Sequence, residues 1–169
     1  TLTIMRKACE LIERYHGVPP SKVEVIPTGV NLKLFRPVDD PAALAAVDRK
    51  YGLPPKYFMV IGPYLPPRRA NASFTLRAFA ELKARGWTGG CSLVFVGSPH
   101  PNLDALLAEA RELGLAGDVR CTGFVPVEDL PALYGRSLAV VHPTSVEGFG
   151  FGNERLPLFE PLPGSARRS

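Results

Sequence analysis

Short apolar runs alternate with stretches of helical periodicity along most of this chain, and that alternation constrains its fold more than any other feature. The apolar runs lie at residues 57–62, 92–97, 119–123 and 138–142. Apolar residues at helical spacing fill the intervals, at 71–86, at 103–113 and from Pro126 onward. Four strands that alternate with three helices predict a parallel sheet with right-handed crossovers. We therefore expect a Rossmann-like, doubly wound α/β domain.

The first two of these helices carry an apolar side suited to packing on a sheet. In the first helix, that side consists of Phe74, Leu76, Phe79 and Leu82. In the second helix, which Gly114 ends, it consists of Leu103, Leu106, Leu107, Ala110 and Leu113. We expect both sets of side chains to enter the core.

Three further elements are predicted upstream. Residues 2–16 repeat apolar side chains at helical spacing up to a glycine, and 23–31 indicate a short strand that ends in a turn. Residues 39–52 carry both end signals of a helix, because Pro41 lies in the first turn and Gly52 follows the last.

The composition excludes several classes of protein. With 169 residues, 46% hydrophobic and 21% charged, the chain has the make-up of a globular domain. No apolar run approaches the ~20 residues that a membrane-spanning helix needs, and the N-terminus lacks the hydrophobic region of a signal peptide. Since residue 1 is not methionine, we expect the chain to begin inside a longer protein.

Charge and cysteine usage narrow the range of partners. Cys9, Cys91 and Cys121 are widely separated, which predicts no metal site and favours a reducing, cytoplasmic location. The net charge is +4, but the basic residues are scattered and no basic stripe with interleaved aromatics occurs. We therefore expect no binding to nucleic acid.

The stretch 138–150 joins a strand to an acidic turn. Its apolar run indicates a strand covered on both faces, and Pro143 ends that strand because proline has no N–H for the ladder. Glu147 then lies beyond the carboxyl end of a strand, where open α/β sheets bind ligands. Gly148 and Gly150 let backbone amides approach a ligand closely. An isolated turn of this kind is more often only a turn, so the motif needs support from the rest of the chain.

That support is a set of motifs in one order. They are IPTGVN, LFRP, PPRRAN, SLVFVG, GLAGDVRCTGFVPVEDLPALY and PTSVEGFG. Over residues 1–150 this order resembles the group-1 (family 4) retaining glycosyltransferases, GT-B enzymes built from two Rossmann-like domains. The resemblance implies hexose transfer, with retention, from a UDP- or GDP-sugar bound in the C-terminal domain, without a metal or other cofactor. The acceptor, a glycan, lipid or small molecule, would be held mainly by an N-terminal domain.

The resemblance also divides the chain. Residues 1–37 correspond to the end of the N-terminal domain and the interdomain linker, and 38–150 to an incomplete donor-binding domain. Residues 151–169 match nothing in the family, and we expect an irregular, non-native tail there. The acceptor domain is missing from this sequence. The full-length protein would be cytoplasmic, either free or peripheral to the inner face of the membrane.

Site residues carry over from the family by position. Arg69 matches the basic residue that contacts the donor diphosphate. A guanidinium suits this role because it binds phosphate oxygens bidentately and stabilises the charge on the leaving diphosphate. Gly62 ends the preceding strand and Arg68 adjoins Arg69 in the same donor-binding loop; a solvated pair of arginines in a loop is the alternative. The second arginine of many relatives is replaced by Pro63. Gly97 ends the next strand, where a backbone would pass close to the ligand; the alternative is a glycine that only ends the strand.

Two further loops complete the implied donor site. Phe124 and Val125 match the loop whose backbone faces the nucleobase; the alternative is a core aromatic beside a turn. Glu147 matches the first of the family's paired glutamates, so it would contact donor-sugar hydroxyls and be catalytic together with the arginine of the diphosphate loop. The adjoining backbone, which touches sugar and phosphate in the family, is that of Gly148, Phe149 and Gly150.

The pattern breaks after residue 150. The second glutamate's position holds Arg155, and three prolines in 151–169 exclude a regular helix. A shifted reading frame or a truncation would explain the change, and a divergent tail is the alternative. We expect no transferase activity from this chain alone and at most nucleotide-sugar binding. A non-catalytic nucleotide-binding module, or a remnant without ligand, is the competing function. An oxidoreductase is disfavoured because no G-x-G-x-x-G follows a strand.

Overall fold

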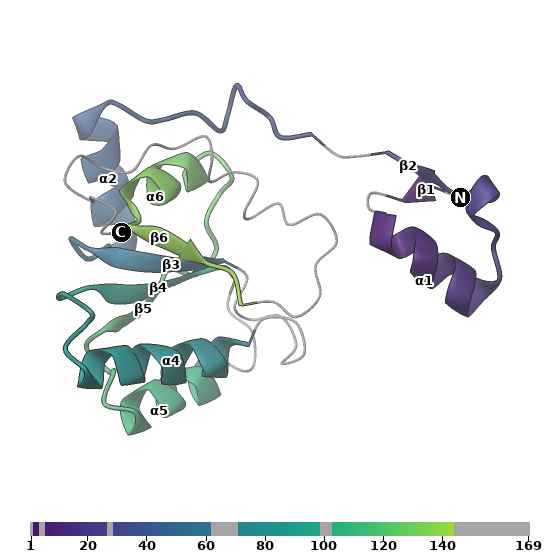
Figure 1. The fold of residues 1–169 in the computed structure, drawn as a ribbon. Helices are drawn as coiled ribbons and strands as arrows, with labels where there is room; N and C mark the ends of the chain where they lie inside the picture. Colours follow the sequence, from purple (N-terminus) through teal and green to yellow (C-terminus); the bar gives the residue numbers. More distant parts are fainter. Residues whose placement is uncertain (1, 4–5, 27–28, 62–70, 99–102, 144–169) are drawn as a thin grey trace.

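The computed structural model describes residues 2–3, 6–26, 29–61, 71–98 and 103–143, which form two separate sheets (Figure 1). The N-terminal elements are β1 (Leu2–Thr3), α1 (Arg6–His16), the 3-10 helix η1 (Pro20–Lys22) and β2 (Glu24–Val25). The larger sheet domain consists of α2 (Pro41–Tyr51), β3 (Tyr57–Ile61), α4 (Ala72–Ala84), β4 (Ser92–Val96), α5 (Leu103–Glu112), β5 (Val119–Cys121), α6 (Leu130–Arg136) and β6 (Ala139–Val141). The predicted tail, 151–169, lies outside the described residues.

The N-terminal elements form a small β–α–β unit in which β1 pairs in parallel with β2. The prediction of one helix from residue 2 is wrong at its start. The residues of β1 pair with Glu24 and Val25, so the helix begins only at Arg6. Its end is confirmed, because Gly17 adopts a left-handed φ of 63° directly after it. Of the strand predicted over 23–31, the described residues form only the two of β2, and 27–28 lie outside the described residues.

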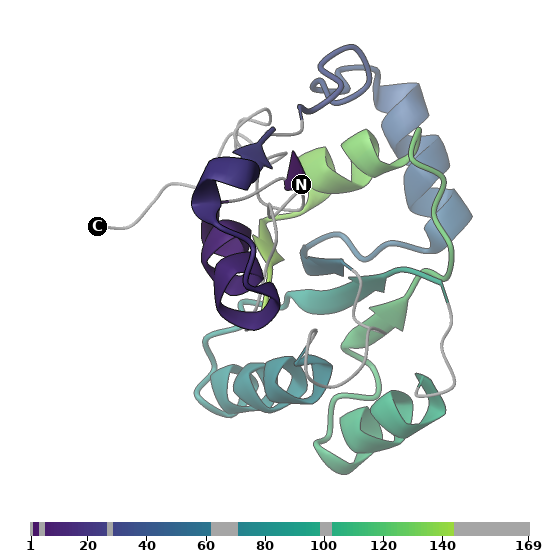
Figure 2. The same ribbon diagram turned by 90° about the vertical axis from the view of Figure 1, so that its right-hand side faces the viewer.

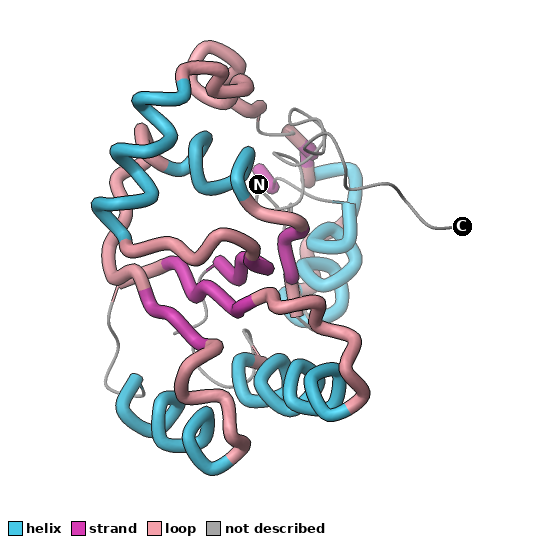
Figure 3. The backbone as a smooth tube through the Cα atoms, turned by 90° about the vertical axis from the view of Figure 1, so that its left-hand side faces the viewer, coloured by secondary structure: helices cyan, strands magenta, loops and turns pink. Residues whose placement is uncertain are grey.

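The larger sheet is fully parallel, and its strand order is β5-β4-β3-β6. Val60 of β3 lies opposite Phe95 of β4 on one side and opposite Val141 of β6 on the other. α4 and α5 cover one face of the sheet, and α2 and α6 cover the other (Figure 1 and Figure 3). The predicted doubly wound α/β fold is therefore confirmed.

The ends of α2 are confirmed, whereas the start of α6 is not. Asp40 caps α2 by accepting a hydrogen bond from a first-turn N–H at 2.9 Å, and Gly52 follows the last turn with a left-handed φ of 58°. α6 was expected to start at Pro126. Instead the carbonyl of Pro126 accepts a hydrogen bond from the N–H of Asp129 at 3.1 Å, which makes a turn, and the helix begins at Leu130.

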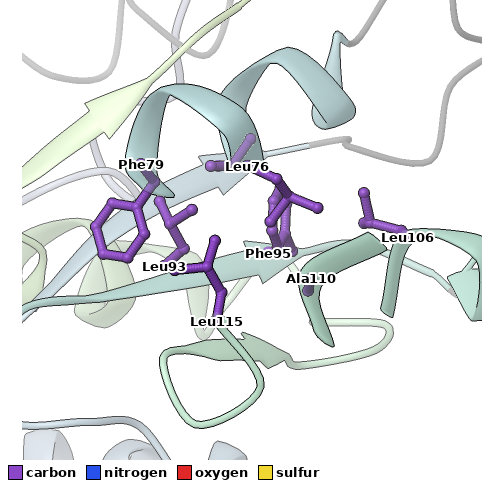
Figure 4. Close-up of a cluster of buried hydrophobic side chains, with 8 residues drawn as sticks. Leu76, Phe79, Leu93, Phe95, Leu106, Ala110 and Leu115 are labelled. Atoms are coloured by element: carbon purple, nitrogen blue, oxygen red, sulfur yellow. The ribbon is translucent and has the colours of Figure 1, made fainter. Parts of the chain in front are cut away.

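The first core cluster lies between the sheet and the layer of α4 and α5 (Figure 4). Its buried residues are Val60, Leu76, Phe79, Leu93, Phe95, Leu106, Ala110 and Leu115. Of the apolar side predicted for α5, Leu106 and Ala110 are buried in this cluster and Leu103 and Leu113 pack against it, but Leu107 is half-buried outside it. The apolar side predicted for α4 is also confirmed only in part. Phe74 is 69% exposed and Leu82 is 38% exposed. Phe74 points away from the sheet because it lies two residues, or about 200° of helical rotation, from Leu76.

A second cluster fills the space between the sheet and the layer of α2 and α6. It consists of Phe35, Tyr57, Met59, Val94, Val96, Val125, Leu133 and Tyr134. Phe35 packs edge to face against Tyr134, with ring centres 6.3 Å apart. The packing of the sheet domain thus reaches back to Phe35, while the domain boundary between residues 37 and 38 stays a prediction.

β6 is less covered than its apolar sequence predicts. Leu138 is 38% exposed and Ala139 is exposed, so the expectation of a strand covered on both faces is wrong. Within the described residues β6 pairs with β3 alone and forms an edge of the sheet. An edge strand is open to solvent along one side, and an apolar run does not distinguish an edge strand from a central one.

Side-chain hydrogen bonds and an ion pair connect α2 to α6. The carboxylate of Asp129 accepts hydrogen bonds from the ammonium of Lys50 at 2.6 Å and from the hydroxyl of Tyr51 at 2.5 Å. The bond from Lys50, followed by that from Tyr51, lowers the pKa of Asp129. Arg136 and Asp48 form an ion pair at 3.0 Å. Together these contacts fix the helix that leads the chain into β6.

Candidate functional site

The strand order creates a topological switch point between β3 and β6. From β3 the chain continues to β4 and β5 on one side, and α6 then carries it back to β6 on the other side of β3. In open α/β sheets, ligands bind at such a point, in the crevice beyond the carboxyl ends of the strands. Figure 2 shows the sheet from its carboxyl side, with α2 and α6 above it and α4 and α5 below. The candidate site therefore lies beyond the ends of β3 and β6.

Most of the predicted donor-binding residues follow these two strands directly in the sequence. Gly62, Arg68 and Arg69 come after β3, and Glu147, Gly148, Phe149 and Gly150 come after β6. They lie outside the described residues, and their roles stay predictions. The structure establishes where their segments begin: the first leaves the sheet after Ile61 and the second continues from Pro143.

Gly97 leaves β4 at the same edge, but its backbone amide is already engaged. The N–H of Gly97 donates to the carbonyl of Gly123 at 3.2 Å, so this donor joins the ends of β4 and β5. Gly123 itself has a left-handed φ of 73°, which turns the chain toward Phe124. The predicted role of Gly97 in donor binding stays untested, and it would have to use groups other than this N–H.

Phe124 and Val125 point in opposite directions. The ring of Phe124 is 69% exposed, whereas Val125 is buried in the second core cluster. The alternative that Phe124 is a core aromatic is therefore wrong. Phe124 presents an open aromatic face beyond the end of β5, while Val125 anchors that loop to the sheet domain and leaves only its backbone available to a ligand.

A contact between Asn71 and Pro143 links the described residues that border the two segments of the site, and the sequence did not indicate it. The side-chain amide of Asn71 donates a hydrogen bond to the carbonyl oxygen of Pro143 at 2.7 Å. Asn71 is the first described residue after 62–70, and Pro143 is the last one before 144. An asparagine directly before a helical pattern indicates a helix cap, and nothing in that pattern points to a partner far along the chain.

A hollow of about 220 Å³ lies elsewhere on the sheet domain. It is lined by Leu107, Ala110, Arg111, Ala116 and Val119. Val119 begins β5 and Arg111 lies in the last turn of α5, so the hollow is at the amino end of the strands. It forms no part of the candidate site.

The described residues bring together no metal-binding cluster. Among them, no three His, Cys, Asp or Glu side chains lie close enough to hold an ion. Cys91 is buried, and its burial raises the pKa of the thiol. Cys9 and Cys121 are half-buried, and none of the three cysteines forms a disulfide.

The family of the chain follows from its match to a known sequence profile. The profile of the family described as "Glycosyl transferases group 1" matches residues 49–152, which include both strands of the switch point. The chain therefore belongs to the group 1 glycosyltransferases, and the resemblance stated from its motifs is confirmed.

Curated relatives are named glycosyltransferases. The chain is 33% identical over 150 residues to D-inositol 3-phosphate glycosyltransferase of Thermobispora bispora, covering 85% of this chain and 34% of the relative. It is 32% identical over 138 residues to GDP-mannose-dependent alpha-(1-6)-phosphatidylinositol monomannoside mannosyltransferase of Mycobacterium tuberculosis, covering 82% and 34%. This chain thus spans about a third of the length of these relatives.

Solved structures agree on the fold. A glycosyltransferase from Rickettsia africae superposes with a TM-score of 0.80 at 19% identity, over 95% of this chain and 42% of that one. Anabaena HepE, solved in complex with UDP and glucose, superposes with a TM-score of 0.71 at 17% identity, over 93% and 41%. The sheet domain thus has the fold of one Rossmann-like half of the GT-B glycosyltransferases. None of the helices in the described ranges is both long and apolar enough to cross a bilayer.

Proposed function

We propose that this chain binds the nucleotide-diphosphate sugar of a retaining hexosyltransferase. The observation that carries the proposal is the switch point between β3 and β6, because the family match spans both strands and continues into the segments that leave them. A crevice at that place suits a ligand with a diphosphate and many hydroxyl groups, since loops from several strand ends can supply backbone and side-chain donors there.

The proposed donors are UDP- and GDP-sugars. HepE was solved with UDP and glucose, and the mycobacterial relative is named for its dependence on GDP-mannose. These relatives favour the two nucleotides without deciding between them for this chain. The net charge of +4 is compatible with an anionic diphosphate ligand.

The proposed roles follow the chemistry of each side chain. The guanidinium of Arg69, assisted by Arg68, binds the diphosphate and stabilises the charge that develops on it as the sugar leaves. The carboxylate of Glu147 accepts hydrogen bonds from donor-sugar hydroxyls. The exposed ring of Phe124 lies in the loop proposed to face the nucleobase. With an arginine at the diphosphate, the proposal includes no metal and no further cofactor.

The full transfer reaction is proposed for a longer protein. This chain covers only about a third of the length of these relatives, and reaction between donor and acceptor requires both to be held in one geometry. We therefore propose that the acceptor is bound by a domain outside this sequence. One relative takes its name from a phosphatidylinositol mannoside, which favours a peripheral association of the longer protein with a membrane surface.

A calorimetric titration of the purified chain with UDP, GDP and their hexose conjugates tests the donor site. We expect saturable binding of one nucleotide series. The double variant Arg69→Ala, Glu147→Ala is expected to weaken it at least about tenfold, because it removes one diphosphate contact and one sugar contact.

The matched control is Arg85→Ala, Glu81→Ala. Like the double variant, it removes one arginine and one glutamate. These two residues form an ion pair at the C-terminal end of α4, away from the candidate site, so the affinity should stay unchanged. A folded chain that binds neither nucleotide series would contradict the proposal and favour the remnant without ligand.

A further inference from the structure

Asn71 lies directly before α4 but has a backbone conformation that a residue at the start of a helix does not need. Its φ and ψ are 39° and 38°, in the left-handed region. Among the residues that the structure describes, it is the only one other than glycine with a positive φ. This conformation costs a side-chain-bearing residue about 1 kcal/mol or more. Asparagine is one of the few residue types that tolerates it, and a specific contact offsets the remaining cost.

A local role as a helix cap does not explain this conformation. Asparagine at the N-cap of a helix normally has extended backbone angles, and its side chain accepts a hydrogen bond from the first turn. Asn71 precedes α4, yet its side chain makes no such bond. Its amide instead donates to the carbonyl of Pro143, 72 residues further along the chain.

Both ends of this contact are held firmly. The carbonyl of Asn71 accepts hydrogen bonds from the N–H of Thr75 at 3.0 Å and from its hydroxyl at 3.2 Å. Thr75 is only 5% exposed, so α4 anchors Asn71 to the core. Pro143 follows two residues after Val141, which is paired with Val60 of β3. The contact therefore joins two parts of the rigid sheet domain.

The two partners of this contact lie close in the sequence to two predicted donor-binding residues. Arg69 precedes Asn71 by two residues, and Glu147 follows Pro143 by four. At a maximum of about 3.6 Å per residue, the chain can separate the Cα atom of Arg69 from that of Asn71 by at most roughly 7 Å, and the Cα atom of Glu147 from that of Pro143 by at most roughly 14 Å. We propose that Asn71 is a positioning residue, which through its contact with Pro143 fixes the points where the two donor-binding segments join the sheet domain. This proposal rests on the function proposed above.

Two substitutions at Asn71 and one control test the proposal. Asn71→Asp keeps the size of the side chain and its tolerance of a left-handed backbone, but sets a carboxylate oxygen against the carbonyl of Pro143. Asn71→Gly adopts the same backbone freely and deletes the side chain. The control, Ser73→Ala, removes a hydrogen bond of 2.6 Å to Glu109 from the same helical turn without touching Pro143.

We expect both Asn71 variants to bind the nucleotide about tenfold more weakly than the parent chain, and Ser73→Ala to bind it as tightly as the parent. All four proteins are compared at temperatures well below their melting points, so that loss of folded protein does not contribute. Parent-like affinity in Asn71→Gly would overturn the proposal, because the loss in Asn71→Asp would then come from charge repulsion alone.

Backbone amide NMR signals of the ligand-free chain separate this inference from the proposed function. We expect both Asn71 variants to shift the amide signals of Glu147–Gly150, and Ser73→Ala to leave them in place. If the parent binds no nucleotide, the proposed function fails, and the signals alone decide on the contact. Shifts at Glu147–Gly150 would then support a positioning role, and unchanged signals would overturn it.

Discussion

Phe79→Ala is expected to lower the free energy of unfolding by about 3–5 kcal/mol, the range for removing a buried aromatic side chain. Phe79 is 3% exposed, lies in the first core cluster and packs edge to face against Phe58 with ring centres 6.4 Å apart. Because small domains are stable by only about 5–15 kcal/mol, this single change should remove a large part of the stability. Urea denaturation followed by circular dichroism measures it.

Phe74→Ala is the matched control, since it removes the same side chain from the same helix. Phe74 is 69% exposed, so its loss should change the free energy of unfolding by no more than about 0.5 kcal/mol. Similar losses of unfolding free energy for the two variants would contradict the structure, in which Phe79 is buried in the core and Phe74 is exposed to solvent.

Tyr57→Phe is expected to reduce the loss of stability at alkaline pH. Tyr57 is fully buried, and its hydroxyl donates a hydrogen bond of 2.8 Å to the carbonyl of Leu133 in α6. Burial is the main cause that raises the pKa of Tyr57 far above its ordinary value of 10.0; the charge of Asp48 adds to the rise, and Arg136 opposes it.

The sign of the effect follows from proton binding in the two states. Above about pH 10 the unfolded chain releases the proton of Tyr57 while the folded chain retains it, so stability falls as pH rises. The slope from this one group approaches about 1.4 kcal/mol per pH unit. Below pH 10 the contribution of the protonated hydroxyl is fully present. Tyr57→Phe lacks the titrating group and should lose less stability above pH 10.

At neutral pH the same variant should be less stable than the parent by about 1 kcal/mol, the net contribution of one hydrogen bond. The carbonyl of Leu133 keeps a second donor, the N–H of Ser137 at 3.1 Å, which limits the loss. Urea midpoints measured from pH 7 to 11 give both effects. Tyr15→Phe, whose ring is 69% exposed, is the control. If the urea midpoints of Tyr57→Phe and the parent changed in parallel with pH, this would contradict the assignment of the alkaline loss of stability to Tyr57.

The parts of the fold that could be predicted depend on local signals. α2 was predicted closely because Asp40, Pro41 and Gly52 determine its ends through their own backbone and capping preferences. The parallel sheet could be predicted because strand and helix periods alternate over a long stretch. The start of α6 could not, since Pro126 is compatible with both a helix start and the turn that forms.

Other features depend on contacts between distant residues. Whether Phe74 or Leu76 faces the sheet is decided by how α4 is rotated against β3 and β4, and both are apolar. The exposure of β6 depends on its place at the sheet edge. The contact of Asn71 with Pro143 could not be predicted, because an asparagine before a helix indicates only a cap. For the candidate site, the sequence therefore predicts residue types and strand ends but not the link between them.

The strand order also has a consequence for the sequence of folding events. Tyr57 of β3 pairs with Ser92 of β4, whereas Phe58 pairs with Ala139 of β6, which is much further along the chain. Closing the longer loop costs more conformational entropy, so contacts within β3, β4 and β5 are expected to form before β6 joins. Pulse-labelled hydrogen exchange should show protection of β4 amides before β6 amides; simultaneous protection would argue against this order.

If β6 joins last, the crevice at the switch point exists only once folding is complete. A nucleotide bound there would contact the ends of both β3, which pairs early, and β6, which pairs last. Such a ligand would therefore slow the first step of unfolding, the departure of β6, in addition to shifting the folding equilibrium by mass action.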